Sequence, residues 1–146
     1  MIVRKYTGSD SDRLYEIICA SLDEPYAKEM IPYFHAQWSD GLLVACDFTG
    51  RPIGFLAASK IDSSNARIMM FAVDPVHRSM GIGSELLINL KRVAMMNGIA
   101  HISLEVRPSN MRAINLYKRH GFVPTEVLRD YYNNGGDALR MDLIFN

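Results

Sequence analysis

The sequence predicts a mixed α/β fold built as a single domain. Its 146 residues are enough to bury roughly two thirds of the surface that the unfolded chain would expose. Short apolar or alternating runs, typical of strands, are interleaved with segments of helical periodicity. The clearest junction runs from the apolar stretch 68–73, through a loop with two glycines at 78–83, into a helical segment. No repeat, linker or low-complexity tract divides the chain, so we expect one domain over residues 1–146.

The first half is expected to hold a strand, two helices and three antiparallel strands. Residues 2–6 favour a strand, and Ser9, Asp10 and Ser11 supply N-cap chemistry for a helix. The apolar residues of that helix are Leu14, Ile17, Ile18 and Leu22. Pro25 is placed to open a second helix that runs to about Gln37. Residues 42–48, 53–60 and 67–73 predict strands separated by turns at 49–52 and 62–65.

The second half is expected to alternate helices and strands. One helical stripe, ended by Gly98, consists of Ile82, Leu86, Leu90, Val93 and Ala94. The next strand alternates, with Ile102, Leu104 and Val106 on one face and His101, Ser103, Glu105 and Arg107 on the other. Asn110 is placed to cap a helix whose shared face carries Ala113, Leu116 and Tyr117. Residues 122–127 and 138–145 complete a mixed sheet around a turn at 131–136.

Composition narrows the range of partners. Lys plus Arg and Asp plus Glu number 16 each, so we expect neither nucleic acid nor a membrane as a partner. The longest apolar run has six residues and no signal peptide is indicated, which predicts a cytoplasmic protein. Cys19 and Cys46 lack Cys-x-x-Cys spacing and are expected to be buried free thiols. The four histidines show no metal-ligand spacing, so no metal site is expected.

The loop at 78–83 has the chemistry of an anion site. Its glycines let the backbone approach a ligand closely, the first turn of the following helix presents unpaired N–H groups, and Arg78 adds a positive charge. Together these three features suit a phosphate group best. A tight strand-to-helix turn without a ligand is the alternative. A dinucleotide fingerprint fits less well, because Leu86 stands where its third glycine would be.

Four segments in this order resemble the GNAT superfamily of N-acetyltransferases. They are Phe71 to Pro75, Arg78 to Gly83, Leu104 to Asn110, and Leu116-Tyr117 followed by Gly121-Phe122. Within the superfamily the chain is similar to protein N-terminal acetyltransferases of the RimI and arrest-defective types. Residues 22–26, His77-Arg78 and the run 131–138 carry this closer likeness, although Gly136 replaces a glutamate of the subfamily pattern. The resemblance implies a mostly antiparallel sheet of six to seven strands, splayed in the middle, with about four helices on its faces.

The resemblance also implies an acetyl-CoA site without a metal. The pyrophosphate would meet backbone amides of the loop, which comprises Arg78, Ser79, Met80, Gly81, Ile82, Gly83 and Ser84. The pantetheine arm would pair with the backbone of Phe71, Ala72 and Val73, and the Val73 N–H would polarise the thioester carbonyl. Asn110 would contact the coenzyme or order a water beside it, with a plain N-cap as its alternative role.

The catalytic and substrate residues follow from the same likeness. Glu105 is expected to remove a proton from the amine through a water, and Tyr117 to meet the coenzyme sulfur and protonate it. Glu24, Tyr26, Tyr131 and Tyr132 would line the peptide groove. The predicted activity is acetylation of protein N-termini. A lysine or small-amine acetyltransferase and a non-catalytic acetyl-CoA-binding module are the alternatives. A monomer or weak homodimer is expected, with the need for an auxiliary subunit left open.

Overall fold

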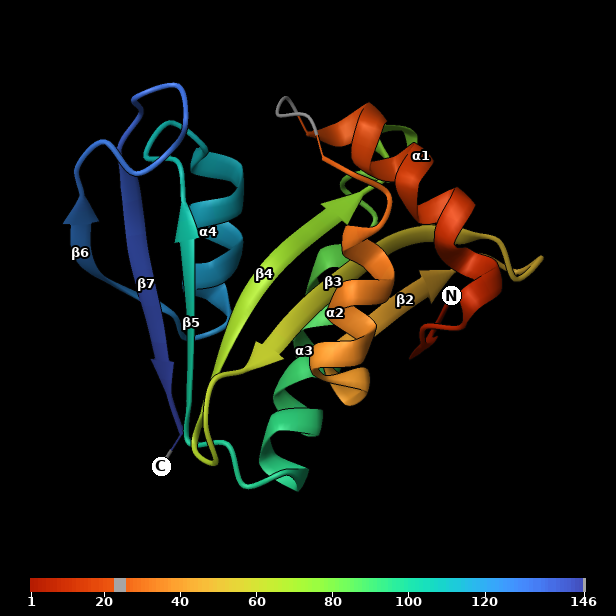
Figure 1. Cartoon of the computed structure of the whole chain (residues 1–146), viewed down its shortest axis with the longest axis horizontal. Helices are drawn as coiled ribbons and strands as arrows, with labels where there is room; N and C mark the ends of the chain where they lie inside the picture. The colour runs from red at the N-terminus through yellow and green to blue at the C-terminus, as the bar shows by residue number, and fades with distance from the viewer. Residues whose placement is uncertain (23–25, 146) are drawn as a thin grey trace.

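The computed structural model describes residues 1–22 and 26–145, and these form one seven-stranded sheet (Figure 1). The strand order is β1-β2-β3-β4-β5-β7-β6, and only the β4–β5 pair is parallel. The strands are β1 (Ile2–Lys5), β2 (Leu42–Cys46), β3 (Pro52–Lys60), β4 (Asn65–Val73), β5 (His101–Val106), β6 (Val123–Leu128) and β7 (Ala138–Ile144). The prediction of a mixed, mostly antiparallel sheet is confirmed.

Helices cover both faces of the sheet. In the described part of the chain they are α1 (Ser11–Ser21), α2 (Met30–Gln37), α3 (Ile82–Met96) and α4 (Met111–Arg119), with 3₁₀ turns at 8–10, 39–41 and 75–77. Helices α1 and α2 pack on one face, where Leu14, Ile17, Ile31 and Phe34 form a core with β2 to β4. Helices α3 and α4 pack on the other face, around Leu86, Leu90, Ile114 and Tyr117. The prediction of about four helices is confirmed for the described residues.

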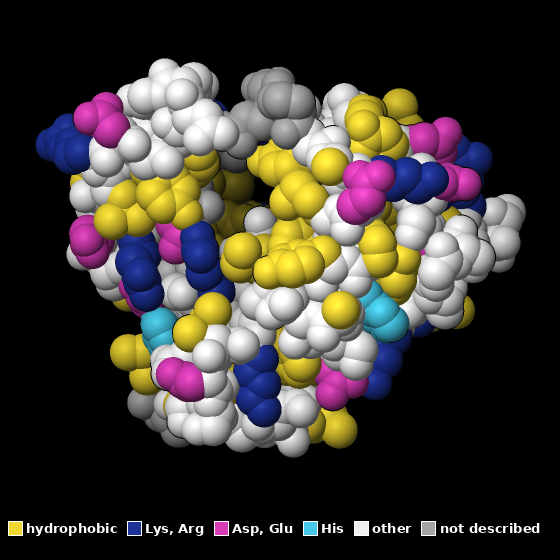
Figure 2. All heavy atoms as spheres, in the orientation of Figure 1, with side chains coloured by type: hydrophobic (Ala, Val, Ile, Leu, Met, Phe, Trp, Pro, Cys, Tyr) yellow, Lys and Arg dark blue, Asp and Glu magenta, His cyan; other side chains and the backbone are white. Residues whose placement is uncertain are grey.

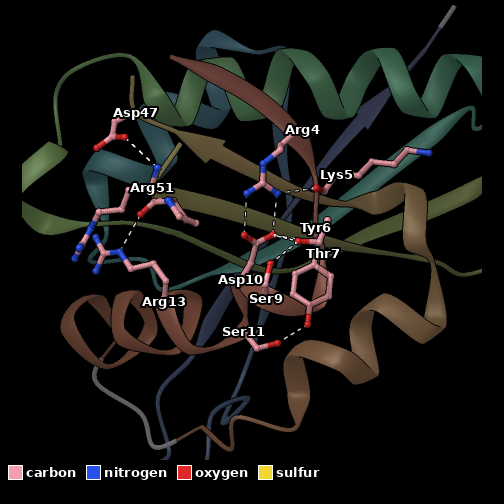
Figure 3. A network of polar contacts seen from close by, with 11 residues as sticks. Arg4, Lys5, Tyr6, Thr7, Ser9, Asp10, Ser11, Arg13, Asp47 and Arg51 are labelled. Atoms are coloured by element: carbon pink, nitrogen blue, oxygen red, sulfur yellow. Dashed lines mark hydrogen bonds and ion pairs between the residues drawn. The ribbon is translucent and has the colours of Figure 1, made fainter. Parts of the chain in front are cut away.

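A buried carboxylate ties β1 to the start of α1 (Figure 3). Asp10 is 5% exposed and accepts two hydrogen bonds of 2.8 Å from the Arg4 guanidinium and one of 2.8 Å from the Thr7 N–H. The side chain of Asp10 therefore closes the preceding turn rather than capping α1 itself, for which Asp10 is the N-cap residue without a side-chain bond. This fixes the edge strand to the helix across the sheet end.

Helix α2 begins five residues later than predicted. Pro25 lies outside the described residues, and 26–29 form a non-helical stretch before Met30. The prediction of a helix from Pro25 is wrong because of Pro32, which is tolerated only in the first turn, where a missing N–H leaves no broken bond. Starting at Met30 places Pro32 third in the helix and sets Ile31 and Phe34 into the core.

A β-bulge in β4 reverses which face its residues cover. Ala57 pairs with Met70 while Ala58 pairs with Ile68, so Met69 has no partner in β3. Ile68 consequently belongs to the α3 side of the core and Met70 to the α1–α2 side, although the two residues are two apart. An uninterrupted strand would have placed both on the same face.

Strands β4 and β5 part shortly after they meet. Their parallel pairing covers Asn65 with His101, Ala66 with Ile102, and Arg67 with Ser103. Beyond that point β4 stays with β3 and β5 stays with β7, so the two strands diverge as a fork (Figure 1). The predicted splay in the middle of the sheet is confirmed.

The two cysteines differ in burial. Cys46 is buried and Cys19 is exposed, and both thiols are free. The expectation of two buried thiols is wrong for Cys19, because it lies on the solvent face of α1, away from buried Leu14, Ile17 and Ile18. Among the described helices, none combines the length and apolar character needed to cross a bilayer.

Candidate active site

A cleft of 1280 Å³ fills the fork between β4 and β5. The hollow opens between the β5–β7–β6 side and the α1 side of the molecule (Figure 2). Most of the predicted site residues line it: Tyr26, Phe71, Ala72, Val73, Arg78, Ser79, Gly81, Ile82, Gly83, Ser84, Glu105, Asn110, Tyr117, Tyr131 and Tyr132. The side chain of Met80 is 65% exposed and is not part of this lining, and Glu24 lies outside the described residues.

The edge of β4 presents the backbone groups of two residues to the cleft. The Asp74 N–H donates to the Ile53 carbonyl at 2.8 Å, and the pairs of β4 with β3 alternate from there. By this alternation the N–H and C=O groups of Phe71 and Val73 point away from β3 and into the fork. The Val73 carbonyl accepts a hydrogen bond of 3.1 Å from the Ser21 hydroxyl at the end of α1.

Ala72 contributes differently from its neighbours. It is paired with Phe55 in the hydrogen-bonded register, so its N–H and C=O groups are used within the sheet. The expectation that the Ala72 backbone would pair with a ligand disagrees with this register. Ala72 lines the cleft, so the contact that it can offer a ligand is through its small side chain.

The glycine loop is shaped by left-handed residues. Ser79 has φ 67° and Gly81 has φ 78°, a conformation that turns neighbouring N–H groups toward one side. Gly81 is the N-cap of α3 and provides no side-chain cap, so the N–H groups of the first turn are available to a ligand. The Arg112 guanidinium donates to the Ser79 hydroxyl at 3.1 Å and holds the loop against α4.

Gly83 has a packing reason to be glycine. A Cβ at this position would lie 3.0 Å from Leu116 Cδ2 and 3.4 Å from Phe71 Cζ. The first turn of α3 can therefore approach β4 and α4 closely only with glycine here. Ser84, one residue on, contacts His120 Nε2 through its hydroxyl at 2.9 Å.

Tyr117 reaches the cleft from α4. Asn110 begins that helix, and its side-chain oxygen accepts from the Ala113 N–H at 3.2 Å, which confirms it as the N-cap residue. The Tyr117 ring packs against Phe71 and Phe122, with centroids 6.1 and 5.7 Å away, and is 7% exposed. Burial raises the pKa of Tyr117 well above its usual value, with a further contribution from Tyr132. The phenol therefore stays protonated throughout the physiological range.

Glu105 is held by two partners. Arg67 Nε donates to Glu105 Oε1 at 2.8 Å, and Arg67 Nη2 lies 2.5 Å from the same oxygen. The Tyr131 hydroxyl donates to Oε1 at 3.3 Å and accepts from Arg67 Nη2 at 2.6 Å. Burial, followed by the Glu105 carboxylate, raises the pKa of Tyr131. The three side chains thus form a closed ring at the base of the fork.

Arg67 also lines the cleft, although the sequence patterns did not predict it as a site residue. It is the one charged side chain in an otherwise apolar strand segment, 66–73, and it pairs in register with Ser103, two residues before Glu105. A lone arginine entering an apolar run opposite an acidic strand position was the available signal.

Gly136 makes room for an arginine. Arg107 lies over the Tyr132 ring, 4.0 Å from its centroid, and its Nη1 would be 2.8 Å from a Cβ at position 136. A glutamate at 136, as in the subfamily pattern, would therefore require Arg107 to move. The tyrosine pair itself is T-shaped, with Tyr131 and Tyr132 centroids 5.0 Å apart.

The Cys46 thiol lies on β2, outside the cleft lining. Burial raises the pKa of the Cys46 thiol, which disfavours it as a nucleophile, as expected for an apolar strand. Within residues 1–22 and 26–145, no cluster of three or more His, Cys, Asp or Glu side chains is arranged to hold a metal ion.

Comparison with known proteins identifies the class. Residues 11–122 match the acetyltransferase (GNAT) family, and the seven-stranded, forked sheet is the fold of that family. The chain belongs to the GNAT family and is an N-acetyltransferase.

Individual relatives and structures refine this placement. An uncharacterized N-acetyltransferase of Methanocaldococcus jannaschii is 34% identical over 97% of this chain and 90% of its own. A putative ribosomal protein bS18-alanine N-acetyltransferase of Bacillus subtilis is 31% identical over 99% of this chain and 95% of its own. The structure of Ard1 from Thermoplasma volcanium aligns with TM-score 0.95 and 34% identity, covering 99% and 97% of the two chains. A chain of the NatC complex bound to Gag peptide and CoA aligns with TM-score 0.90 and 27% identity, covering 99% and 98%.

Proposed function

We propose that this protein transfers the acetyl group of acetyl-CoA to the free α-amino group of protein N-termini. The observation that carries the proposal is one continuous cleft with two kinds of lining. The glycine loop and the start of α3 form one part of the lining, Tyr26, Tyr131 and Tyr132 form another, and Glu105 and Tyr117 also line the cleft. The relative named for alanine N-acetylation and the neighbour bound to a peptide support the same reading.

The donor side has features suited to acetyl-CoA. Uncapped N–H groups at the start of α3, next to Arg78, suit a pyrophosphate, and the edge groups of Phe71 and Val73 suit the amides of a pantetheine arm. When bound, acetyl-CoA supplies an activated acetyl group and a thiolate that can depart. The Val73 N–H would stabilise negative charge on the carbonyl oxygen, an interaction worth about 3 kcal/mol of barrier in comparable sites.

Protons are handled by two side chains in this proposal. Glu105 receives a proton from the attacking amine through a water, so that the nitrogen lone pair forms the new N–C bond while the C–S bond breaks. Tyr117 then donates its phenol proton to the departing sulfur. Its raised pKa makes it a weaker acid, but the same buried environment disfavours the thiolate, so proton transfer between the two stays feasible.

An α-amine suits this base better than lysine does. Its pKa of about 7.7 to 8.0, against about 10.4 for lysine, leaves about a tenth or more neutral at pH 7. Tyr26, Tyr131 and Tyr132 carry hydroxyls that can bond the first peptide units of the substrate.

A panel of peptides tests the proposal. Peptides starting with free Ser, Ala, Met or Thr should release thiol from acetyl-CoA, and the same peptides with a blocked α-amine and an internal lysine should not. Equal rates on the blocked peptides would point to lysine acetylation instead.

A third outcome separates the non-catalytic alternative. Coenzyme affinity in calorimetry, without thiol release from any peptide or small amine, would indicate a binding module. The convergence of Glu105 and Tyr117 on one cleft favours an enzyme.

A further inference from the structure

We propose that Arg67 is a positioning residue that fixes the Glu105 carboxylate for catalysis and couples it to the peptide-binding loop through Tyr131. The inference deepens the proposed function and rests on its assignment of Glu105 as the base. Arg67 acts through Glu105 and is not expected to touch either substrate.

The contacts converge on a single oxygen. Arg67 Nε, Arg67 Nη2 and the Tyr131 hydroxyl all lie within 3.3 Å of Glu105 Oε1. Among the described residues, no side chain hydrogen-bonds Glu105 Oε2. Because Oε1 is fully engaged, Oε2 is the oxygen left to take up a proton from the cleft.

Arg67 also lies at the point where β4 and β5 diverge. Its pair with Ser103 is the last one before β4 and β5 diverge. A side chain at this vertex can reach the polar face of β5 without crossing the open fork. The bulge at Met69 comes after Arg67. It therefore changes which face the later residues of β4, such as Met70, cover, but not the face to which Arg67 points.

The three hydrogen-bonded side chains line two hollows. Arg67, Glu105 and Tyr131 line the main cleft and also a second hollow of 420 Å³, whose other lining residues are Ile61, Ser103, Leu128 and Arg140. The Glu105 side chain is 9% exposed, so its charge depends on Arg67 for compensation. Without Arg67 the carboxylate would be free to turn toward the second hollow, where Arg140 offers another cation.

Tyr131 extends the coupling to the loop between β6 and β7. Its hydroxyl accepts from Arg67 and donates to Glu105, while its ring packs against Tyr132. A peptide that engages this loop is therefore linked to the orientation of the base by two hydrogen bonds. Arg67 serves as the common anchor.

A double-mutant cycle tests the inference on whichever amine the peptide panel shows to be the better acceptor. We expect Arg67→Met to lower kcat about tenfold and Glu105→Gln about a hundredfold. The Arg67→Met/Glu105→Gln double variant should be no slower than Glu105→Gln alone, within about twofold, because Arg67 acts only through Glu105. Arg67→Lys, which keeps the charge but loses the paired N–H groups, should fall between wild type and Arg67→Met.

Arg92→Met is the matched control. Arg92 is an exposed arginine of α3 that bonds Asn89 at 3.4 Å and lines neither hollow, so the kcat of this variant should equal that of wild type. Acetyl-CoA affinity by calorimetry and the melting temperature, measured for every variant, separate catalytic loss from loss of folding. Arg67→Lys serves for the cycle if Arg67→Met does not fold.

The outcomes separate this inference from the proposed function. Wild-type kcat in Arg67→Met, together with a slow Glu105→Gln, overturns the role of Arg67 alone. An equal further loss from Arg67→Met in the Glu105→Gln background also overturns it, because Arg67 would then act independently. Wild-type kcat in Glu105→Gln overturns the assignment of the base, and with it the route through which Arg67 acts.

Discussion

Glu105 and Tyr117 line the same cleft but are constrained in different ways. The Glu105 carboxylate is tied through one oxygen to Arg67 and Tyr131, whereas the Tyr117 ring is fixed by Phe71 and Phe122. No described residue hydrogen-bonds the Tyr117 hydroxyl, so its position is set by packing and its proton is not shared within the protein. In the proposed mechanism these two groups move protons in opposite directions.

Removing the Tyr117 hydroxyl should slow the reaction without weakening donor binding. We expect Tyr117→Phe to reduce kcat about a hundredfold, because in the proposed mechanism the departing sulfur loses its proton donor, while the packed ring is retained. Thiol release measures kcat, and calorimetry measures acetyl-CoA affinity. Tyr33→Phe, on an exposed tyrosine of α2, is the control. Turnover unchanged from wild type would remove Tyr117 from the mechanism.

Motifs in the sequence predicted most of the residues that line the cleft, but not all of their partners. Glu105, Tyr117 and Tyr131 follow from motifs, because the fork brings strand ends and loops of fixed spacing to one cleft. The Arg67–Glu105 contact was not predicted, because it depends on the register at the fork vertex. The use of the Ala72 backbone within the sheet likewise depends on hydrogen-bond alternation, which residue types do not reveal.

At the scale of elements, the strand-to-helix loop is the part whose shape matters most. Its left-handed residues aim backbone groups at the cleft, while Gly83 lets α3 approach β4. Local signals predicted the strands and helices well, since caps such as Asn110 and alternation such as that of β5 act within a few residues. The start of α2 was predicted wrongly although Pro32 is a local signal against a helix that begins at Pro25. The bulge at Met69 could not be predicted from residue types, because it depends on how both faces of β4 pack.

A pair of glycine substitutions isolates the function of the loop. Gly81→Ala and Gly50→Ala each place an alanine where the backbone is left-handed, with φ 78° and 85°. At neither position would the added Cβ contact anything within 4 Å. Each should therefore lose about 1 kcal/mol of stability in urea unfolding. Only Gly81→Ala should raise the Kd for acetyl-CoA, by about tenfold, because only that loop faces the cleft. Equal affinities for the two variants would contradict the assignment of the loop.

At the scale of the whole molecule, the Arg4–Asp10 pair joins the edge of the sheet to its first helix (Figure 3). The hydrogen bonds from Arg4 lower the pKa of Asp10 below its usual value of 3.8. The folded state therefore favours the ionised form. This contribution to stability is present above the usual pKa and is lost as the pH falls through the lower, folded-state pKa.

Asp10→Asn should expose that contribution. We expect it to lower the free energy of unfolding by about 2 kcal/mol at pH 7, because it removes a buried charge from its paired arginine. The difference from wild type should shrink as the pH is lowered below 4 in a series of urea titrations. Asp40→Asn, in an exposed pair with Lys5 at 2.6 Å, should change stability by less than about 1 kcal/mol. A difference for Asp10→Asn that persists unchanged to low pH would contradict this account.

Because of the fork, β4 and β5 are unpaired with each other over much of their length. The two halves of the sheet, β1 to β4 and β5 to β7, share three residue pairs at one end, and the rest of that seam lacks strand-to-strand bonds. In the proposed binding mode the donor lies along this seam and supplies hydrogen bonds that the protein does not make for itself. Cohesion between the halves then rises when the donor arrives and falls when the product leaves. Each catalytic cycle would thus also be a cycle of tightening and loosening of the fold itself.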